Sequence, residues 1–149
     1  MPDSPRIALA PEVLALLGAR NLGSLATIRS NGRPQLSVVN FAWSPLECVA
    51  RTSTRSNLAK VANLRRDPRV SLMLISEDGW SYAVLEGQAE LSPVAQARED
   101  DTVDQLVDLY RSIAGKDHPD WDDYRRAMVD DGRLVLSVVV ERAYGPTRG

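Results

Sequence analysis

Short runs of apolar residues, several of them alternating with polar ones, recur along this chain and indicate a protein built mainly from strands. The pair Asn31-Gly32 separates the first two runs, and because both residues tolerate positive φ it is a strong hairpin signal. Gly87 interrupts a long run and predicts a bulge or a bend there. Strands are expected at residues 22–28, 34–43, 46–52, 70–76, 80–91 and 133–144.

Tight turns or short links join most of these strands, so the sheet is expected to be mainly antiparallel. About six strands, a conspicuous hairpin and a helical segment before the last strand predict a small β-barrel. Closure into a barrel also removes the exposed edges that such apolar strands would leave. The predicted fold class is therefore mainly β with helices.

Four segments carry helical spacing instead. Thr102 stands three residues before Gln105 and fits a capping box, which predicts the start of an amphipathic helix. Pro68 disfavours helical geometry at Asp67 and ends a shorter one. Helices are expected at about residues 11–18, 58–67, 102–115 and 121–129.

At 149 residues the chain is expected to form a single domain, long enough to bury a core without disulfides or metal. Residues 1–10 are predicted to be a loose arm, about 93–130 a helical insert, and 145–149 a tail. The lone cysteine, Cys48, excludes an intramolecular disulfide framework and is expected to be a packed thiol in a strand.

Net charge of −2 argues against general nucleic-acid binding. The chain has no apolar run near the ~20 residues of a membrane span, and its start lacks a charged-then-apolar signal pattern. A cytoplasmic protein that acts on a small molecule, without nucleic-acid or membrane partners, is expected.

Familiar catalytic motifs are absent: the sequence has no glycine-rich nucleotide loop and no nucleophile elbow. His118, the single histidine, argues against a histidine-based metal site, no metal is expected, and a solvated position in an acidic loop is predicted for it. Asp100-Asp101 and Asp122-Asp123 are adjacent pairs, which diverge on a helix, so they are interpreted as helix-start and solvated charges rather than as a catalytic carboxylate pair. No catalytic residue is assigned, and if the protein is an enzyme, a bound cofactor is expected to supply the chemistry.

One polar cluster is a candidate anion site. Ser53, Thr54, Arg55 and Lys60 lie where a strand runs into the start of a short helix. Helix N-termini present unpaired N–H donors, and arginine and lysine add charge-assisted hydrogen bonds, so this combination suits a phosphate. The alternative is an ordinary capped surface helix with solvated charges.

Two further features are candidates for contact with a cofactor. Gln35 and Ser37 share one face of the strand after the hairpin, whereas Asn40 lies on the other unless a bulge intervenes. Trp80 and Tyr82 flank a turn and are suited to covering a flat ring, although core aromatics at a strand start give the same pattern.

Together these stretches resemble the pyridoxamine 5′-phosphate oxidase-like split-barrel flavoproteins, and the resemblance extends from about residue 22 to 144. Two of the runs narrow it to the actinobacterial branch that uses coenzyme F420, a deazaflavin, in place of FMN; they are DGWSYAV (78–84) and WDDYR (121–125). The family as a whole is indicated by LATI (25–28), GRPQ (32–35) and NLRRDPRV (63–70).

The resemblance implies a homodimer of six-stranded split β-barrels with two cofactor sites at the subunit interface. It places Lys60 on the cofactor phosphate, Ser53 and Gln35 near the ring system, and Trp80 at the partner subunit's site. Members of this branch carry an arginine two residues before the matching lysine, where this chain has Leu58, and Arg55 is the candidate substitute.

The leading hypothesis is thus an F420-dependent reductase that transfers a hydride to a small organic acceptor. The first alternative is an FMN-binding oxidase or reductase of the same fold, including a pyridoxamine 5′-phosphate oxidase. The second alternative is a non-catalytic protein that binds the cofactor. The physiological substrate is not specified by any of these residues.

Overall fold

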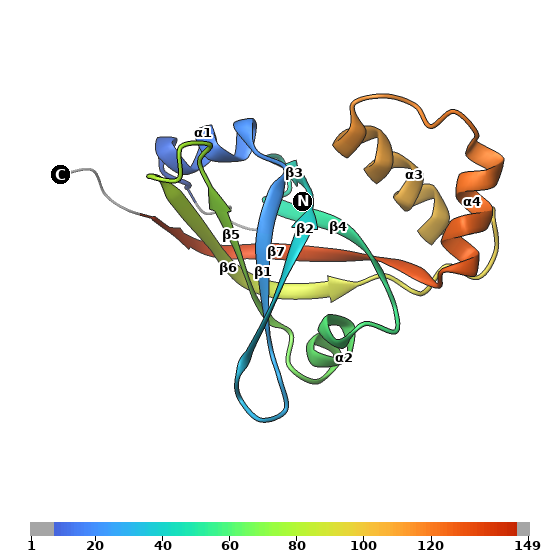
Figure 1. Ribbon diagram of the computed structural model, residues 1–149, viewed down its shortest axis with the longest axis horizontal. Helices are drawn as coiled ribbons and strands as arrows, with labels where there is room; N and C mark the ends of the chain where they lie inside the picture. Colours follow the sequence, from blue (N-terminus) through green and yellow to red (C-terminus); the bar gives the residue numbers. More distant parts are fainter. Residues whose placement is uncertain (1–7, 146–149) are drawn as a thin grey trace, which may run out of the picture.

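A computed structural model describes residues 8–145, and one curled antiparallel sheet dominates it (Figure 1). Neighbouring strands follow the order β2-β1-β5-β6-β7-β4-β3. The strands are β1 (Leu22–Ile28), β2 (Pro34–Asn40), β3 (Ala42–Ser44), β4 (Val49–Arg55), β5 (Arg69–Ile75), β6 (Tyr82–Leu91) and β7 (Arg133–Tyr144).

Four helices flank the sheet, and none in the described part of the chain has the length and apolarity to span a bilayer. Figure 1 shows α1 at one end of the sheet, the α3–α4 pair at the other, and α2 beside the lower end of β1. Their bounds are α1 (Pro11–Ala19), α2 (Ala59–Arg66), α3 (Asp101–Ala114) and α4 (Trp121–Asp130).

The described residues form seven strands, not the expected six, because the predicted strand 34–43 is broken at Phe41. The Phe41 ring is buried in the core, and its N–H donates to the carbonyl oxygen of Asn21 at 2.8 Å, one pair beyond the last residues of the β1–β2 ladder. The chain turns there, and β3 pairs with β4 rather than with β1. A hydrophobic run marks a strand but carries no signal for such a break.

The barrel is split between β2 and β4. These strands share no ladder, yet they lie close enough for the Thr52 hydroxyl to donate to the Asn40 carbonyl at 2.6 Å. The strand expected at 46–52 begins later, at Val49, because Cys48 adopts a positive φ of 58° in the preceding turn. The Cys48 thiol is buried, as expected, but it lies in a turn and not in a strand.

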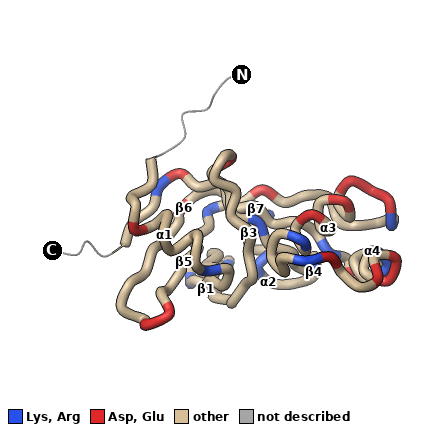
Figure 2. Tube along the Cα trace, turned by 90° about the horizontal axis from the view of Figure 1, so that it is seen from above, with Lys and Arg blue, Asp and Glu red and all other residues tan. Residues whose placement is uncertain are grey.

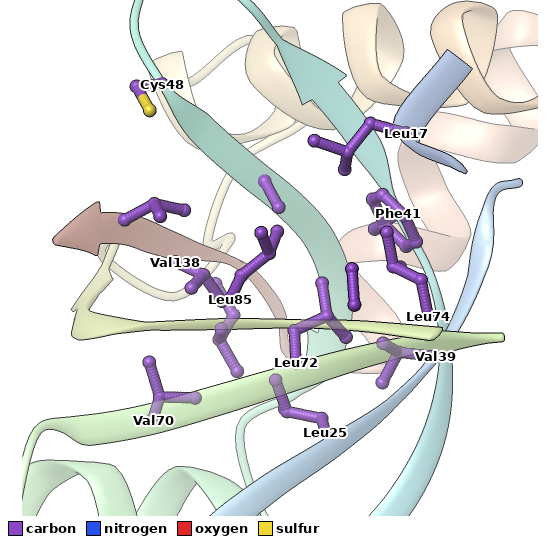
Figure 3. Packing of buried hydrophobic residues seen from close by; sticks show 14 of the residues in the cluster. Leu17, Leu25, Val39, Phe41, Cys48, Val70, Leu72, Leu74, Leu85 and Val138 are labelled. Atoms are coloured by element: carbon purple, nitrogen blue, oxygen red, sulfur yellow. The ribbon is translucent and has the colours of Figure 1, made fainter. Parts of the chain in front are cut away.

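Alternate residues of the strands fill one apolar core on the concave side of the sheet (Figure 3). Leu25, Leu72 and Leu85 stand opposite one another on β1, β5 and β6 and are almost fully buried. Leu17 of α1 packs onto the same cluster from above, so this helix closes one end of the half-barrel.

Strand β7 is apolar on both faces because it serves two cores. Leu134 and Leu136 point into the half-barrel, whereas Val135 points to the opposite side. There it packs against the second cluster, formed mainly by α3 and α4. The α3–α4 pair is thereby fixed against the outside of β7.

Gly87 marks a bulge, as the sequence predicted. The β6–β7 register shifts between Glu86 and Gly87. A Cβ at Gly87 would lie 1.8 Å from the Val139 carbonyl oxygen, so only glycine allows the two strands to approach this closely.

The expected capping box at Thr102 is wrong. Asp100 caps α3 instead, and its carboxylate accepts from the backbone N–H of Val103 at 2.8 Å. The Thr102 hydroxyl donates to the Pro93 carbonyl at 2.9 Å and ties α3 to the segment leaving β6. Aspartate caps helices at least as well as threonine, and Asp100 stands two residues earlier in the chain.

The face of the sheet opposite the core carries the α3–α4 pair, which packs on Val135, and a separate row of cross-strand neighbours that is called the outer stripe here. Cross-strand neighbours in a single row, running from Val38 through Ser24, Met73 and Val84 to Tyr144, cross five strands on the side opposite the core. Val38 at the sheet edge is 76% exposed. The outer stripe is apolar except for Ser24; Val84 in it is buried, and its two ends, Val38 and Tyr144, are exposed, which makes it a candidate surface for association.

Candidate cofactor pocket

A pocket of about 560 Å³ opens at the split between β2 and β4, within the size range of small-molecule sites. The start of α2 closes it on one side, and the α3–α4 pair closes it on another. It is lined by Val38, Val39, Asn40, Thr52, Ser53, Thr54, Arg55, Leu58, Lys60, Leu109, Tyr110, Ile113, Ala114, Tyr124, Met128 and Arg133.

The predicted hydroxyl and cation cluster lies on this pocket as a group: Ser53, Thr54, Arg55 and Lys60 all line it. They converge because β4 ends at Arg55 and the chain enters α2 after a three-residue turn. The N-cap of α2 is Leu58, and no side chain caps the helix. The first backbone N–H groups of α2 therefore lack the side-chain acceptor that a capped surface helix would have.

Burial gives two of these residues unusual properties. The Thr54 hydroxyl oxygen is buried and has no hydrogen-bond partner among residues 8–145. Burial also lowers the pKa of Lys60 below its usual value, because the charged ammonium loses solvation. Both effects would be relieved by an anionic or hydrogen-bonding group in the pocket.

The opposite wall is apolar and comes from the helical insert. Tyr110, Ile113 and Met128 present rings and methyl groups to the cavity. The Tyr124 hydroxyl is not available to a ligand, since it donates to the Leu106 carbonyl at 2.9 Å. Burial raises the pKa of Tyr124 to about 12, so it stays neutral. The pocket thus combines a cationic side with a flat apolar side.

His118 was expected to be a solvated loop residue, and this is wrong. Its ring is half-buried and lies 5.2 Å from the Tyr110 ring and 5.8 Å from the Trp121 ring, measured between centroids. Its Nδ1 accepts from the Asp120 N–H at 3.0 Å. The histidine helps to rigidify the aromatic wall from behind rather than lining the pocket.

Gln35 and Ser37 do not line this pocket. The Gln35 side-chain oxygen accepts from the Thr27 hydroxyl at 3.2 Å and from the Asn63 amide at 3.4 Å, beneath α2. Ser37 is half-buried on the same face of β2. Within one protomer both side chains belong to the interior of the half-barrel, and their contact with a cofactor stays a prediction.

Trp80 does not line the pocket either. It lies in the turn before β6, outside the strand in which it was expected, and is 84% exposed. An indole this exposed has no role in the core of its own chain, so the core-aromatic interpretation is wrong. Its approach to a second subunit's site stays a prediction.

Arg133 is the charged pocket residue that the sequence did not predict. It opens β7, nearly eighty positions after Arg55, and stands directly opposite Arg55 in the β4–β7 ladder. The register of the β4–β7 ladder brings these two residues together. No local motif in the sequence signals that they are neighbours.

Charge is distributed unevenly around the pocket. Figure 2 shows acidic segments along the α3–α4 excursion, with basic segments near α2 and β4. Residues 99–131 hold eleven acidic and four basic side chains. Cations near the pocket are therefore concentrated on its β4–α2 side.

A sequence profile of the pyridoxamine 5′-phosphate oxidase family matches residues 9–145, nearly the whole chain. The protein therefore belongs to this family. The curled antiparallel sheet agrees with that assignment, and so does the split between β2 and β4.

Individual relatives share the fold over most of their length. An F420H2-dependent biliverdin reductase of Mycobacterium tuberculosis is 28% identical over 138 residues, covering 92% of this chain and 88% of the relative. A solved F420 reductase superposes with a TM-score of 0.68 at 23% identity, covering 91% and 98% of the two chains. An FAD-binding protein from Mesorhizobium loti gives 0.65 at 19% identity, covering 93% and 94%.

Proposed function

We propose that the protein is an F420-dependent oxidoreductase that passes a hydride from the reduced deazaflavin to a small organic acceptor. The observation that carries this proposal is the two-sided pocket at the β2–β4 split. It offers cations and hydroxyls for a phosphate and an apolar wall for a flat ring, in a chain with F420-dependent relatives.

The residues present fit such a cofactor. Lys60 and Arg55 would hold the phosphate, and Ser53 and Thr54 would offer their hydroxyls. The unpartnered Thr54 oxygen supports this arrangement, because a buried hydroxyl without a hydrogen bond costs about 1–3 kcal/mol until a ligand satisfies it.

When bound, the reduced coenzyme supplies the hydride, and the chain's task is to bind and orient donor and acceptor. No Asp, Glu or His lines the pocket in the described part of the chain. Tyr124 is neutral and committed to a backbone carbonyl, so it is not a proton donor. The apolar wall would exclude water from the ring and favour transfer to the acceptor.

A second copy of this chain would complete the site. The outer stripe ends at Val38, which is exposed and also lines the pocket. Covering that stripe with the same face of another protomer would bury it and place new side chains at the pocket mouth. Such a homodimer gives Trp80 of the partner subunit a path to the cofactor.

Equilibrium binding of purified protein to oxidised F420 and, separately, to FMN tests the proposal. Micromolar or tighter F420 binding with weak FMN binding, followed by turnover with reduced F420, is the expected result. The reverse preference would assign the protein to the flavin-dependent enzymes of the family. Tight F420 binding without turnover over a broad acceptor panel would indicate a carrier protein instead.

Lys60→Ala, measured in the same binding experiment, tests whether F420 binds in this pocket. Loss of a hydrogen bond to a charged group should weaken F420 binding by about 1–3 kcal/mol. Lys116→Ala is the matched control, because Lys116 is the chain's only other lysine and is exposed in the loop after α3. Equal affinities of the two variants would remove Lys60 from the site.

A further inference from the structure

The cationic side of the pocket is built across two strands. Arg55 ends β4 and Arg133 begins β7, and as directly paired residues of an antiparallel ladder they project from the same face of the sheet. Ser53, two residues before Arg55, lies on that face too. Leu58 stands at the edge of the same pocket, where the family resemblance leads one to expect an arginine.

Arg133 is held in place by contacts on one side of its guanidinium. Its Nη1 donates to the Ser53 hydroxyl at 3.2 Å, and its Nε donates to the Asp131 carboxylate at 3.4 Å. Its Nη2 has no hydrogen-bond partner among the described residues. The same Asp131 oxygen lies 3.6 Å from Arg55 Nη2, so one carboxylate orients both arginines.

We propose that Arg133 is a direct ligand of the anion in this pocket, with Asp131 as its positioning residue. Together with Arg55 and Lys60 it forms a three-cation cradle that takes the place of the arginine missing at Leu58. This inference rests on the proposed function for the identity of the cofactor, and it specifies the chemical group that the pocket binds: the phosphate of an ester.

The directions of the donors favour a phosphate over a carboxylate. Arg55 and Arg133 reach the pocket from the strands, whereas Lys60 reaches it from α2. A carboxylate presents its two oxygens in one plane, but a tetrahedral phosphate presents oxygens in several directions and accepts from all three cations. With Asp131 counted, the cradle keeps a net charge of +2 near neutral pH, enough to balance a phosphate.

Arg133→Gln and Arg133→Lys test the assignment against two probes, F420 and its phosphate-free deazaflavin nucleoside. Arg133→Gln should weaken F420 binding about tenfold or more and leave nucleoside binding unchanged, with Arg133→Lys in between. Arg126→Ala is the control, because Arg126 is an exposed arginine on α4 that pairs with Asp123 and does not line the pocket. Equal losses for both probes, or no loss beyond that of the control, would overturn the proposal.

Binding of inorganic phosphate tests the role of Arg133 independently of which cofactor the protein uses. If wild-type protein binds neither F420 nor FMN, the proposed function fails, but the cradle is still testable by thermal shift in increasing phosphate against chloride at matched ionic strength. Stabilisation by phosphate in wild type that Arg133→Gln abolishes would support Arg133 as a ligand. Equal stabilisation of both proteins, or of neither, would overturn it.

Discussion

Asn63 joins α2 to the hairpin beneath it, and its replacement by alanine should destabilise the protein measurably. The side chain is buried on α2. Its Nδ2 donates to Thr27 Oγ1 at 3.1 Å and to Gln35 Oε1 at 3.4 Å, while its Oδ1 accepts from Arg66 Nη2 at 3.1 Å. Arg66 continues the link, because its Nη2 also donates to the Ile28 carbonyl at 2.7 Å.

The magnitude follows from these contacts. Two of them have ordinary lengths and one is weak, and a typical net contribution of a hydrogen bond is about 0.5–1.5 kcal/mol. Thr27 keeps its bond to Gln35 in the variant, so the desolvation penalty is partial. Asn63→Ala should therefore lower the free energy of unfolding by about 2–3 kcal/mol, which corresponds to a fall in Tm of about 5–10 °C for a chain of this length.

Urea and thermal unfolding followed by circular dichroism measure this change. Asn57→Ala is the control, because it removes the same side-chain amide from an exposed position in the turn just before α2. It should change stability by less than about 0.5 kcal/mol. If Asn63→Ala unfolds with the same midpoint as Asn57→Ala, the buried network does not hold α2, and Gln35 is free for another role.

Three further expectations are open to direct measurement. Gly87→Ala should lower the free energy of unfolding by several kcal/mol or prevent folding, because its Cβ would collide with the Val139 carbonyl. Far-UV circular dichroism and the yield of soluble protein measure this, and a variant as stable as wild type would contradict it. Burial lowers the pKa of Lys60, so an anion that binds the charged form should lose affinity as pH rises toward the usual lysine value of 10.5; a flat affinity–pH profile would exclude Lys60 as a ligand. Val38→Glu at the end of the outer stripe should shift the proposed homodimer toward monomer in sedimentation, and an unchanged mass would contradict an interface at this stripe.

Local signals in the sequence were enough for most elements. Asn31-Gly32 forms the expected hairpin turn, with Gly32 at a φ of 85°, and β1 and β7 have the predicted bounds. These predictions needed only residues that are neighbours in sequence: the Asn-Gly pair for the turn, and an apolar run for each of the two strands. Where two neighbouring residues could both cap a helix, a tertiary contact determined which one does. Asp100 caps α3 because the Thr102 hydroxyl donates to the Pro93 carbonyl instead.

The pocket was half predictable for the same reason. Its cationic side comes from one continuous stretch of chain, in which Ser53, Arg55 and Lys60 stand within eight positions of one another. Strand end, turn and helix start bring such residues together in almost any fold. The apolar wall comes from α3 and α4, whose inward faces look in sequence like those of any amphipathic pair.

Strand β7 is the element that connects the two halves of the pocket. Its apolar run was recognised as a strand, but a run alone does not say that Val135 faces a second core while Leu134 faces the first. That division fixes the insert beside β4, and the β4–β7 register then sets Arg133 against Arg55. Without this docking the pocket would lose its apolar wall. The assembly of this pocket therefore depends on how β7 is packed on both faces more than on any single motif.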